Sequence, residues 1–436
     1  MGDEHEATDP LSTRIDEKLS SFSTVSSPMC FKVPNLLRKT NEKAYEPQII
    51  SIGPYHHGKE HLEGMEAHKM HCLKGLLQRR KETSVHRYVM ALKGMEDEIR
   101  KCYAEPSAHG DALVEMMLLD GCFIIELICG NLTWTRKIDE QREKNVDFRN
   151  FNWVKLKRDL LLVENQLPFS VLLKLFHMTG EPNQQNVQNF IRMALRFFCT
   201  LMPGNGKGIE PFWVISDPNI ENLLGLVHDS WGPSPEARDN CSKNSAQYGV
   251  WKFIRNATEL KEAGIKFKKK DNGKSIFDIQ FENGVLWIPT IGMYDQTDSI
   301  LRNFIAHEQC HNNYPRYVTD YVTFMDCLIN TRKDVELLRH SGIIVNGLGD
   351  DEVVATIFNR LCDSVVFSNR NFYSEIFINV EKYCGRKWNL WMANLRHNYF
   401  NTPWALISFL AAVSLLTLTA VQYKPYIRFF LIINTK

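Results

Sequence analysis

Residues 111–129 read DALVEMMLLDGCFIIELIC and are apolar around nearly the whole circumference of a helix. A run of this length could cross a bilayer, but Glu115, Asp120 and Glu126 interrupt it. Each charge at the centre of a membrane costs roughly 2.5–3.5 kcal/mol or more. We therefore expect a central helix that is buried among other helices. Its carboxylates then need partners inside the protein.

Helical patterns lie on both sides of this segment. Residues 85–103 place apolar side chains at a period of 3.6 residues, which predicts a helix. Residues 160–176 resemble two helices that meet at Pro168, because proline cannot continue one helix but suits the first turn of the next. Further helices are expected to begin at Asp217-Pro218, to end at Gly264, to span 297–311 and to follow a cap at Asp350.

Short alternating runs occupy 265–270, 275–281 and 285–288, and Asp-Asn-Gly and Glu-Asn-Gly turns separate them. This pattern predicts a small antiparallel β-meander. The expected fold class is therefore mainly α (α+β), with a helix-rich domain over 30–400 that contains the meander. Residues 1–29 are rich in Ser, Thr and charge, and we expect them to form a mobile leader.

Residues 403–421 read PWALISFLAAVSLLTLTAV and carry no charge. About 20 predominantly apolar residues span a bilayer core, and aromatic rings such as those of Trp404 and Tyr423 favour its two surfaces. We predict one C-terminal transmembrane helix over 403–423, followed by a short tail over 424–436. The polar N-terminus shows no secretory signal, which favours a single-pass membrane protein with its bulk in the cytosol. The organelle stays open.

Charge and cysteine content exclude other classes. The chain has 52 Lys and Arg against 51 Asp and Glu, so no overall field attracts nucleic acid. Its 11 cysteines form no C-x-x-C pair, and many fall inside apolar helical patterns. Reduced, buried thiols fit this distribution better than a disulfide framework.

The sequence His307-Glu308-Gln309-Cys310-His311 matches H-E-x-x-H. On a helix its histidines face one way and can share a zinc ion, while Glu308 activates water. A third ligand could be Asp320 or Glu336. Such a match arises by chance in roughly a few per cent of chains of this size, and Pro315 ends the helix soon afterwards. We favour no metal, no cofactor and no catalytic residue, with a membrane-bound zinc hydrolase on His307, Glu308 and His311 as the alternative.

Two further clusters of polar residues are candidate functional sites. Histidines crowd near Cys72 and could bind a metal, but a structural turn is the preferred interpretation; they are His56, His57, His61, His68 and His71. Polar residues in apolar surroundings could perform acid–base chemistry. Buried hydrogen bonds are preferred for them; they are Asp120, Glu126, Glu164, Asn165 and Gln166.

Ordered blocks give the chain a family resemblance. They read AYEPQIISIGPYHHG (44–58), MEAHK (65–69), LLLVENQLPF (160–169), RNFIAHEQC (302–310) and LRHNYFNTPWALIS (395–408). The chain resembles the plant family known as domain of unknown function 247. The resemblance implies a mostly helical domain that ends in a membrane segment, no enzymatic activity, and an aromatic or apolar residue where this chain has His307.

Some grass members of that family are associated with pollen-side self-incompatibility, which suggests recognition work. We therefore expect a non-enzymatic, membrane-anchored plant protein that acts as an interaction or recognition module. Its expected partners are the lipid bilayer, through the C-terminal helix, and an unidentified protein. Nucleic acid is not expected.

Overall fold

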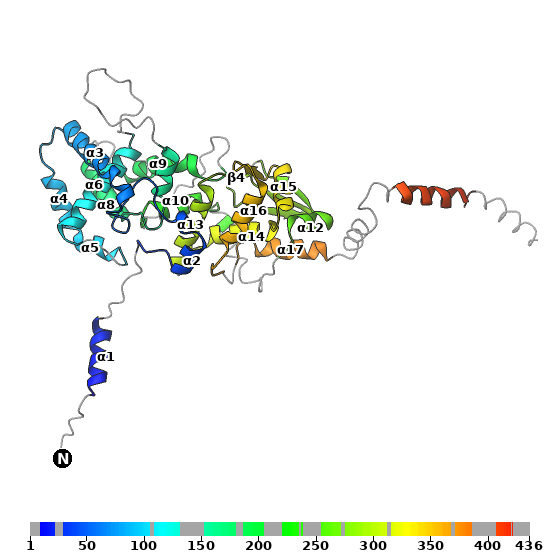
Figure 1. Ribbon diagram of the computed structural model, residues 1–436, viewed down its shortest axis with the longest axis horizontal. Helices are drawn as coiled ribbons and strands as arrows, with labels where there is room; N and C mark the ends of the chain where they lie inside the picture. Colours follow the sequence, from blue (N-terminus) through cyan, green and yellow to red (C-terminus); the bar gives the residue numbers. More distant parts are fainter. Residues whose placement is uncertain are drawn as a thin grey trace, which may run out of the picture. The chain divides into compact units, whose positions relative to one another are not determined.

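The computed structural model describes most of the chain (Figure 1). The described residues are 9–21, 29–104, 109–130, 152–179, 186–204, 220–234, 237–238, 254–271, 275–311, 315–367, 371–385, 407–419 and 421. They fall into two compact units, the first made of Met1–Gly232 with Gln296–Val318 and the second of Pro233–Asp295 with Thr319–Lys436.

The regular elements of unit 1 in its described part are helices, without a named strand. Its helices are α1 (Pro10–Ser21), α2 (Asn35–Thr40), α3 (Gly64–Arg80), α4 (His86–Lys93), α5 (Glu96–Lys101), α6 (Asp111–Ile128), α7 (Trp153–Asp159), α8 (Phe169–Thr179), α9 (Val187–Phe198), α10 (Leu223–Trp231) and α13 (Thr297–Cys310), with short 3-10 turns η1 (Glu42–Ala44), η2 (Glu60–Leu62) and η4 (Cys199–Leu201). Helix α1 lies within the stretch expected to be a leader, and its described side chains are exposed.

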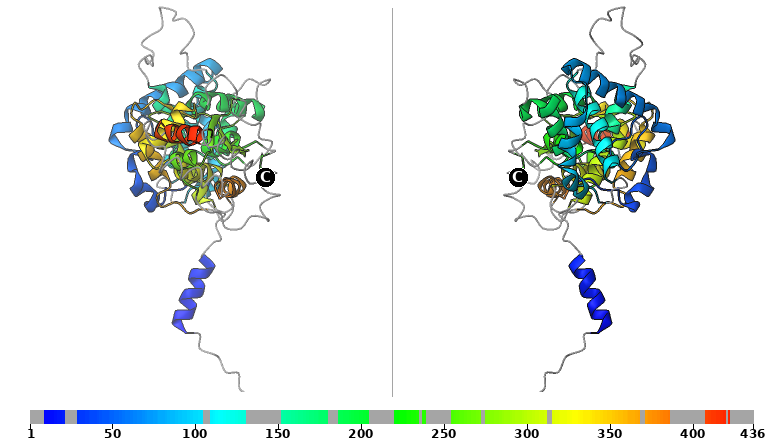
Figure 2. Two further views of the ribbon diagram at one scale, coloured as in Figure 1. Left: turned by 90° about the vertical axis from the view of Figure 1, so that its right-hand side faces the viewer. Right: turned by 90° about the vertical axis from the view of Figure 1, so that its left-hand side faces the viewer.

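The central position of α6 is confirmed. It packs against α3, α4, α8 and α9, and in Figure 2 it lies in cyan among the blue and green helices. Its carboxylates have the partners that burial demands. Asp120 Oδ1 lies 2.6 Å from Lys69 Nζ, and Glu126 accepts two hydrogen bonds from Arg79.

Two predicted helices differ in extent. The 85–103 pattern forms α4 and α5, which Gly94 and Met95 separate. In 160–176 the second helix begins at Phe169 as predicted, but α7 ends at Asp159 and residues 160–168 are not helical. The reason is that the Gln166 side chain donates to the carbonyls of Leu160 and Leu162, replacing helical hydrogen bonds with local ones.

Unit 2 combines helices with two small sheets. Its elements are α12 (Ala257–Glu262), most of α14 (Tyr317–Leu328), α15 (Arg332–His340), α16 (Asp351–Leu361) and α17 (Ser374–Cys384), with β1 (Lys266–Lys269), β2 (Gln280–Glu282), β3 (Val285–Ile288), β4 (Ile291–Met293) and β5 (Ile344–Asn346). Gly264 follows α12 with a φ of 92°, and the Asp350 side chain accepts from Glu352 N, so both predicted helix boundaries are confirmed. The predicted start at Asp217-Pro218 lies outside the described residues.

The predicted antiparallel meander is wrong in its topology. The three-stranded sheet has the order β1-β3-β2, and β1 pairs with β3 in parallel. Only the β2–β3 hairpin is antiparallel, and its Asn283-Gly284 turn has the two positive φ angles of a type I′ hairpin. Most of the run at 275–281 is not extended, because Ser275–Phe277 forms a turn that buries Ile276 and Phe277. The parallel pair β4–β5 was not predicted.

The C-terminal segment departs from the predicted span over 403–423. A described helix covers 407–419, and residues 401–406, 420 and 422–436 lie outside the description, so the predicted tail over 424–436 does too. Within the described part of the chain, no helix combines the length and apolar character that crossing a bilayer requires. All side chains over 407–419 are exposed, among them Leu415 and Leu416 at 69% each.

Candidate functional site

The H-E-x-x-H sequence lies at the C-terminal end of α13 in unit 1, and that helix was predicted correctly. His307 and Glu308 are fully buried, and His311, the residue that caps the helix, is 7% exposed. Because residues four apart lie on one face of a helix, the two imidazole rings are neighbours. Their centroids are 4.6 Å apart.

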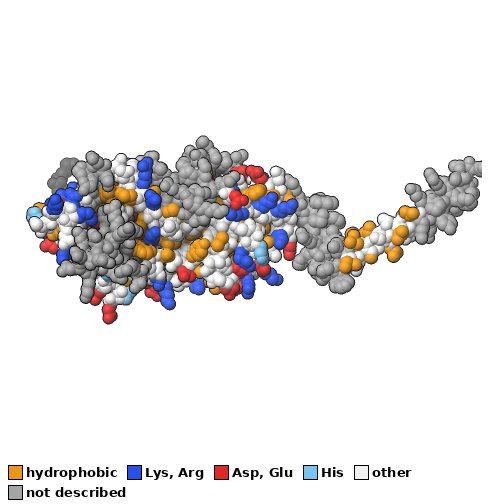
Figure 3. All heavy atoms as spheres, turned by 90° about the horizontal axis from the view of Figure 1, so that it is seen from above, with side chains coloured by type: hydrophobic (Ala, Val, Ile, Leu, Met, Phe, Trp, Pro, Cys, Tyr) orange, Lys and Arg blue, Asp and Glu red, His pale blue; other side chains and the backbone are white. Residues whose placement is uncertain are grey.

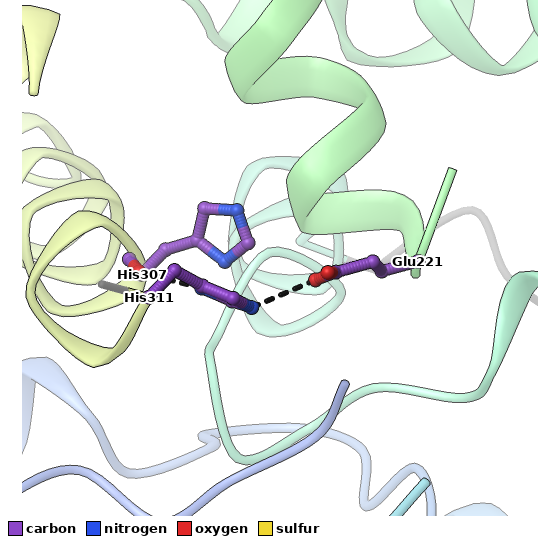
Figure 4. A group of neighbouring side chains, drawn as sticks. All are labelled: Glu221, His307 and His311. Carbon is purple, nitrogen blue, oxygen red and sulfur yellow. Dashed lines mark hydrogen bonds and ion pairs between the residues drawn. The ribbon is translucent and has the colours of Figure 1, made fainter. Parts of the chain in front are cut away.

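A carboxylate from another element completes this group. Glu221 precedes α10, whose first turn Asn222 caps, and its Oε2 lies 2.8 Å from His311 Nε2. Figure 4 shows His311 between His307 and Glu221. One donor atom each from Glu221, His307 and His311 can be chosen so that all lie within 4.8 Å of one another. In the described part of the chain this is the one group of three or more with metal-ligand geometry.

The protonation of the two histidines follows from their contacts. His311 Nδ1 lies 2.9 Å from the carbonyl oxygen of His307 and must donate, since a carbonyl only accepts. Burial opposes charge on His311, but the hydrogen bond to Glu221 outweighs it and raises the pKa. Burial, followed by the nearness of His228 and His311, lowers the pKa of His307 well below its usual value. At neutral pH His307 is therefore an uncharged imidazole.

Glu308 is engaged away from this group. Its Oε1 accepts from Val318 N at 2.8 Å and lies 2.8 Å from His228 Nε2 on α10. Burial disfavours the charged form of His228, but Asp229 and Glu308 outweigh it and raise the His228 pKa to about 9. His228 and Glu308 form a buried ion pair, which leaves Glu308 without the freedom of a zinc-activated general base.

The third ligands that the sequence offered lie elsewhere. Asp320 is in unit 2 and accepts a hydrogen bond from Phe372 N, and Glu336 is exposed on α15 in the same unit. Sequence reasoning missed Glu221, since no spacing rule connects a residue before α10 with the end of α13.

Two of the histidines near Cys72, His56 and His61, make polar contacts around the chain at 46–61. His61 Nε2 lies 3.2 Å from the Pro47 carbonyl oxygen. Buried His56 lies between two carboxylates, 3.4 Å from Glu164 and 3.6 Å from Glu46. For His56 and His61 these contacts agree with the preferred structural interpretation, while His57 and His71 are exposed.

Glu164 is a buried carboxylate with donors from two other segments. It accepts hydrogen bonds from Arg38 and from Val33 N. Burial alone would raise its pKa, but bonds from His56, Arg38 and Val33 outweigh burial and lower the pKa to about 2. The same loop supplies Asn165, whose Oδ1 accepts from Ile52 N at 2.6 Å. Glu164 and Asn165 therefore hold the backbone at Val33 and Ile52 in place. This is the structural role that the sequence analysis preferred for these buried polar residues.

Comparisons with known proteins establish the family. The family model described as "Plant protein of unknown function", domain of unknown function 247, matches residues 30–418, and the chain belongs to this family.

Two curated relatives come from Arabidopsis thaliana. A UPF0481 protein is 30% identical over 417 residues, covering 90% of this chain and 84% of the relative. A putative UPF0481 protein is 22% identical over 498 residues, covering 92% of this chain and 91% of the relative. No solved structure matches the chain.

Proposed function

We propose that the chain is a non-enzymatic module that is tethered to a membrane by segment 403–421 and recognises a protein partner. The observation that carries the proposal is the helix over 407–419, where every side chain is exposed. Figure 3 shows apolar side chains, in orange, along this helix. Contiguous exposed apolar surface marks a site that another apolar phase covers.

A lipid bilayer fits this helix better than a protein groove does. The helix lies inside an uncharged run from Pro403 to Val421, and about 20 such residues match the thickness of the hydrocarbon core. A helix that docks on a protein normally keeps a polar face, whereas the polar residues of this helix are four small hydroxyl side chains, those of Ser408, Ser414, Thr417 and Thr419. The hydroxyls of Ser414, Thr417 and Thr419 each donate to a carbonyl within the helix, as a hydrocarbon environment demands.

The buried site supports a non-enzymatic role. A zinc hydrolase on His307 and His311 needs Glu308 as a base beside a bound water. Glu308 instead accepts from Val318 N and pairs with His228. A recognition role of the kind associated with some grass members of the family is the remaining proposal, with an unidentified protein as partner.

The cysteines support a cytosolic position for the bulk of the chain. Those in the described part are free thiols. Burial raises the pKa of Cys72, Cys122 and Cys310 to about 12, so these thiols are unreactive. Free thiols are typical of a reducing compartment.

Alkaline carbonate extraction of membranes from plant cells tests the tether. The full chain should remain in the membrane pellet, and a chain that ends at Asn401 should appear in the supernatant. Release of the full chain by carbonate would contradict the proposal, because a spanning helix resists extraction.

A further inference from the structure

We propose that Glu221, His307 and His311 bind one divalent transition-metal ion, with Zn²⁺ as the best match, in a structural centre of unit 1. This inference goes beyond the membrane tether and is independent of it. The ligand set is His₂Glu, a combination that proteins use for zinc. The metal would join the C-terminal end of α13 to Glu221, which directly precedes Asn222, the cap of α10.

The distances require only a small contraction. Zinc bonds are about 2.0–2.1 Å to nitrogen and about 2.0–2.2 Å to oxygen, so tetrahedral ligand atoms lie about 3.3–3.5 Å apart. The three donor atoms already lie within 4.8 Å of one another. His311 Nε2 and Glu221 Oε2, at 2.8 Å, would separate slightly as the ion replaces the proton between them.

The surroundings of His311 resemble those of metal-binding histidines. Such a histidine usually donates its second ring N–H to a carbonyl or carboxylate, which fixes the tautomer and aims the other nitrogen at the metal. His311 Nδ1 makes this bond to the His307 carbonyl at 2.9 Å, and its Nε2 points at Glu221 (Figure 4).

Aromatic packing holds both rings in place. Phe31 stacks on His307 with centroids 6.3 Å apart, and it meets His311 edge-on at 5.0 Å. Gly225 on α10 lies next to the His307 ring, and a Cβ there would make ordinary van der Waals contact with it, 3.6 Å from His307 Nε2. Rigid ligands lose little conformational entropy when they bind a metal.

The local charge suits a dication. Three carboxylates lie around the site, those of Glu221, Glu308 and Asp229, and one imidazolium, that of His228, pairs with Glu308 and Asp229.

The same contacts make the centre structural. Glu308 is held by Val318 N and His228, so it cannot serve as the base of a hydrolase. Glu221 keeps 25% of its side chain exposed, which gives the ion a route from solvent past this residue. A water molecule would take the fourth position on that side, as in catalytic zinc sites, but Glu308 is not placed to activate it.

The test uses the full chain, purified in detergent without a polyhistidine tag. Zinc content is measured after purification, and affinity is measured by titrating Zn²⁺ alone into protein that has been treated with chelator. We expect about one ion per chain, and Co²⁺ in its place should give the visible absorption of tetrahedral coordination. Glu221→Gln and His311→Gln should each weaken Zn²⁺ binding at least about 100-fold.

Two variants control for folding and for stray binding. Glu336→Gln changes the exposed carboxylate of unit 2 and should bind Zn²⁺ like the native chain. Glu221→Gln keeps the shape of a partly exposed side chain, so circular dichroism should show a native fold even if His311→Gln is unstable. Added Zn²⁺ should raise the melting temperature of the native chain but not of Glu221→Gln. A native chain without stoichiometric zinc, or Glu221→Gln with native affinity, would overturn the inference.

Discussion

Two apolar helices in this chain differ in burial. Helix α6 contains Glu115, Asp120 and Glu126, yet most of its length is buried in unit 1. The helix over 407–419 contains no charge, yet all its side chains are exposed. The difference shows that low polarity alone does not place a helix in a protein core.

The charges of α6 connect it to its neighbours. Asp120 reaches Lys69 on α3 and Gly53 N, and Glu126 reaches Arg79 on α3. Each pair fixes how α6 sits against α3, which apolar contacts alone specify less sharply. The helix over 407–419 carries no charge with which to make such a connection, which agrees with the lipid surroundings proposed for it.

The largest expected effect comes from breaking the central pair. Lys69 is fully buried, with its Nζ 2.6 Å from Asp120 Oδ1 and 2.7 Å from the Ser51 carbonyl oxygen. Lys69→Met leaves Asp120 buried without its countercharge, which should lower the free energy of unfolding by about 3–5 kcal/mol. Urea denaturation measures this loss. Lys74→Met, on the exposed side of the same helix, should change it by less than about 0.5 kcal/mol; equal effects would contradict the role given to the pair.

Acid should weaken unit 1 through Glu164. Its pKa is about 2 in the folded chain against an ordinary 4.5. A lowered folded-state pKa gives stability that is present above pH 4.5 and is lost as the pH falls toward 2. The contribution is on the order of 3 kcal/mol. Melting temperatures between pH 5 and pH 2 should therefore fall more steeply in the native chain than in Glu164→Gln. Parallel curves would show that this carboxyl is not held as described.

A smaller effect tests the contact between α6 and α8. A Cβ on Gly121 would lie 2.4 Å from Leu175 Cδ1, whereas a Cβ on Gly75 of α3 would meet nothing within 4 Å. Gly121→Ala should therefore cost about 1–3 kcal/mol through overpacking. Gly75→Ala should stabilise the chain by up to about 1 kcal/mol through helix propensity. Thermal unfolding of the two variants should move in opposite directions, and a stabilised Gly121→Ala would refute the close packing.

The smallest effect on folding belongs to the exposed helix. Leu415→Asp should change the free energy of unfolding by less than about 0.5 kcal/mol, because the side chain is 69% exposed. The same substitution should nevertheless make insertion of the helix into a membrane less favourable by about 3 kcal/mol. Circular dichroism and urea denaturation in detergent measure the first quantity. A large loss of stability would mean that this helix packs in a protein core.

The sequence predicted what depends on local pattern. The charges in 111–129 excluded a membrane span and so predicted that α6 is buried in the protein. The apolar period predicted helix α13, and the residue type of Asp350 predicted the cap of α16. Partners that are distant along the chain could not be predicted. The parallel pairing of β1 with β3 and the approach of Glu221 to His311 depend on tertiary packing, which residue spacing does not encode.

Local pattern also failed where side chains compete with the backbone. Residues 160–168 have an apolar helical pattern. The side-chain amides of Asn165 and Gln166 nevertheless bond to backbone groups and hold the segment in a non-helical conformation. Their partners include Ile50 and Ile52, in a segment that sequence reasoning could not bring alongside. The third ligand of the proposed metal centre escaped prediction for the same reason.

Glycosylation in microsomes tests the membrane tether most directly. An Asn-Gly-Thr acceptor appended after Lys436 becomes modified only if the segment 403–421 carries it into the lumen. The chain's own acceptors, Asn131, Asn240 and Asn256, report on the rest of the protein. We predict that the appended acceptor is glycosylated in the native chain, that Leu415→Asp reduces this, and that the three internal acceptors stay unmodified. An unmodified tag, or modified internal acceptors, would contradict a cytosolic domain held at the membrane by its uncharged helix.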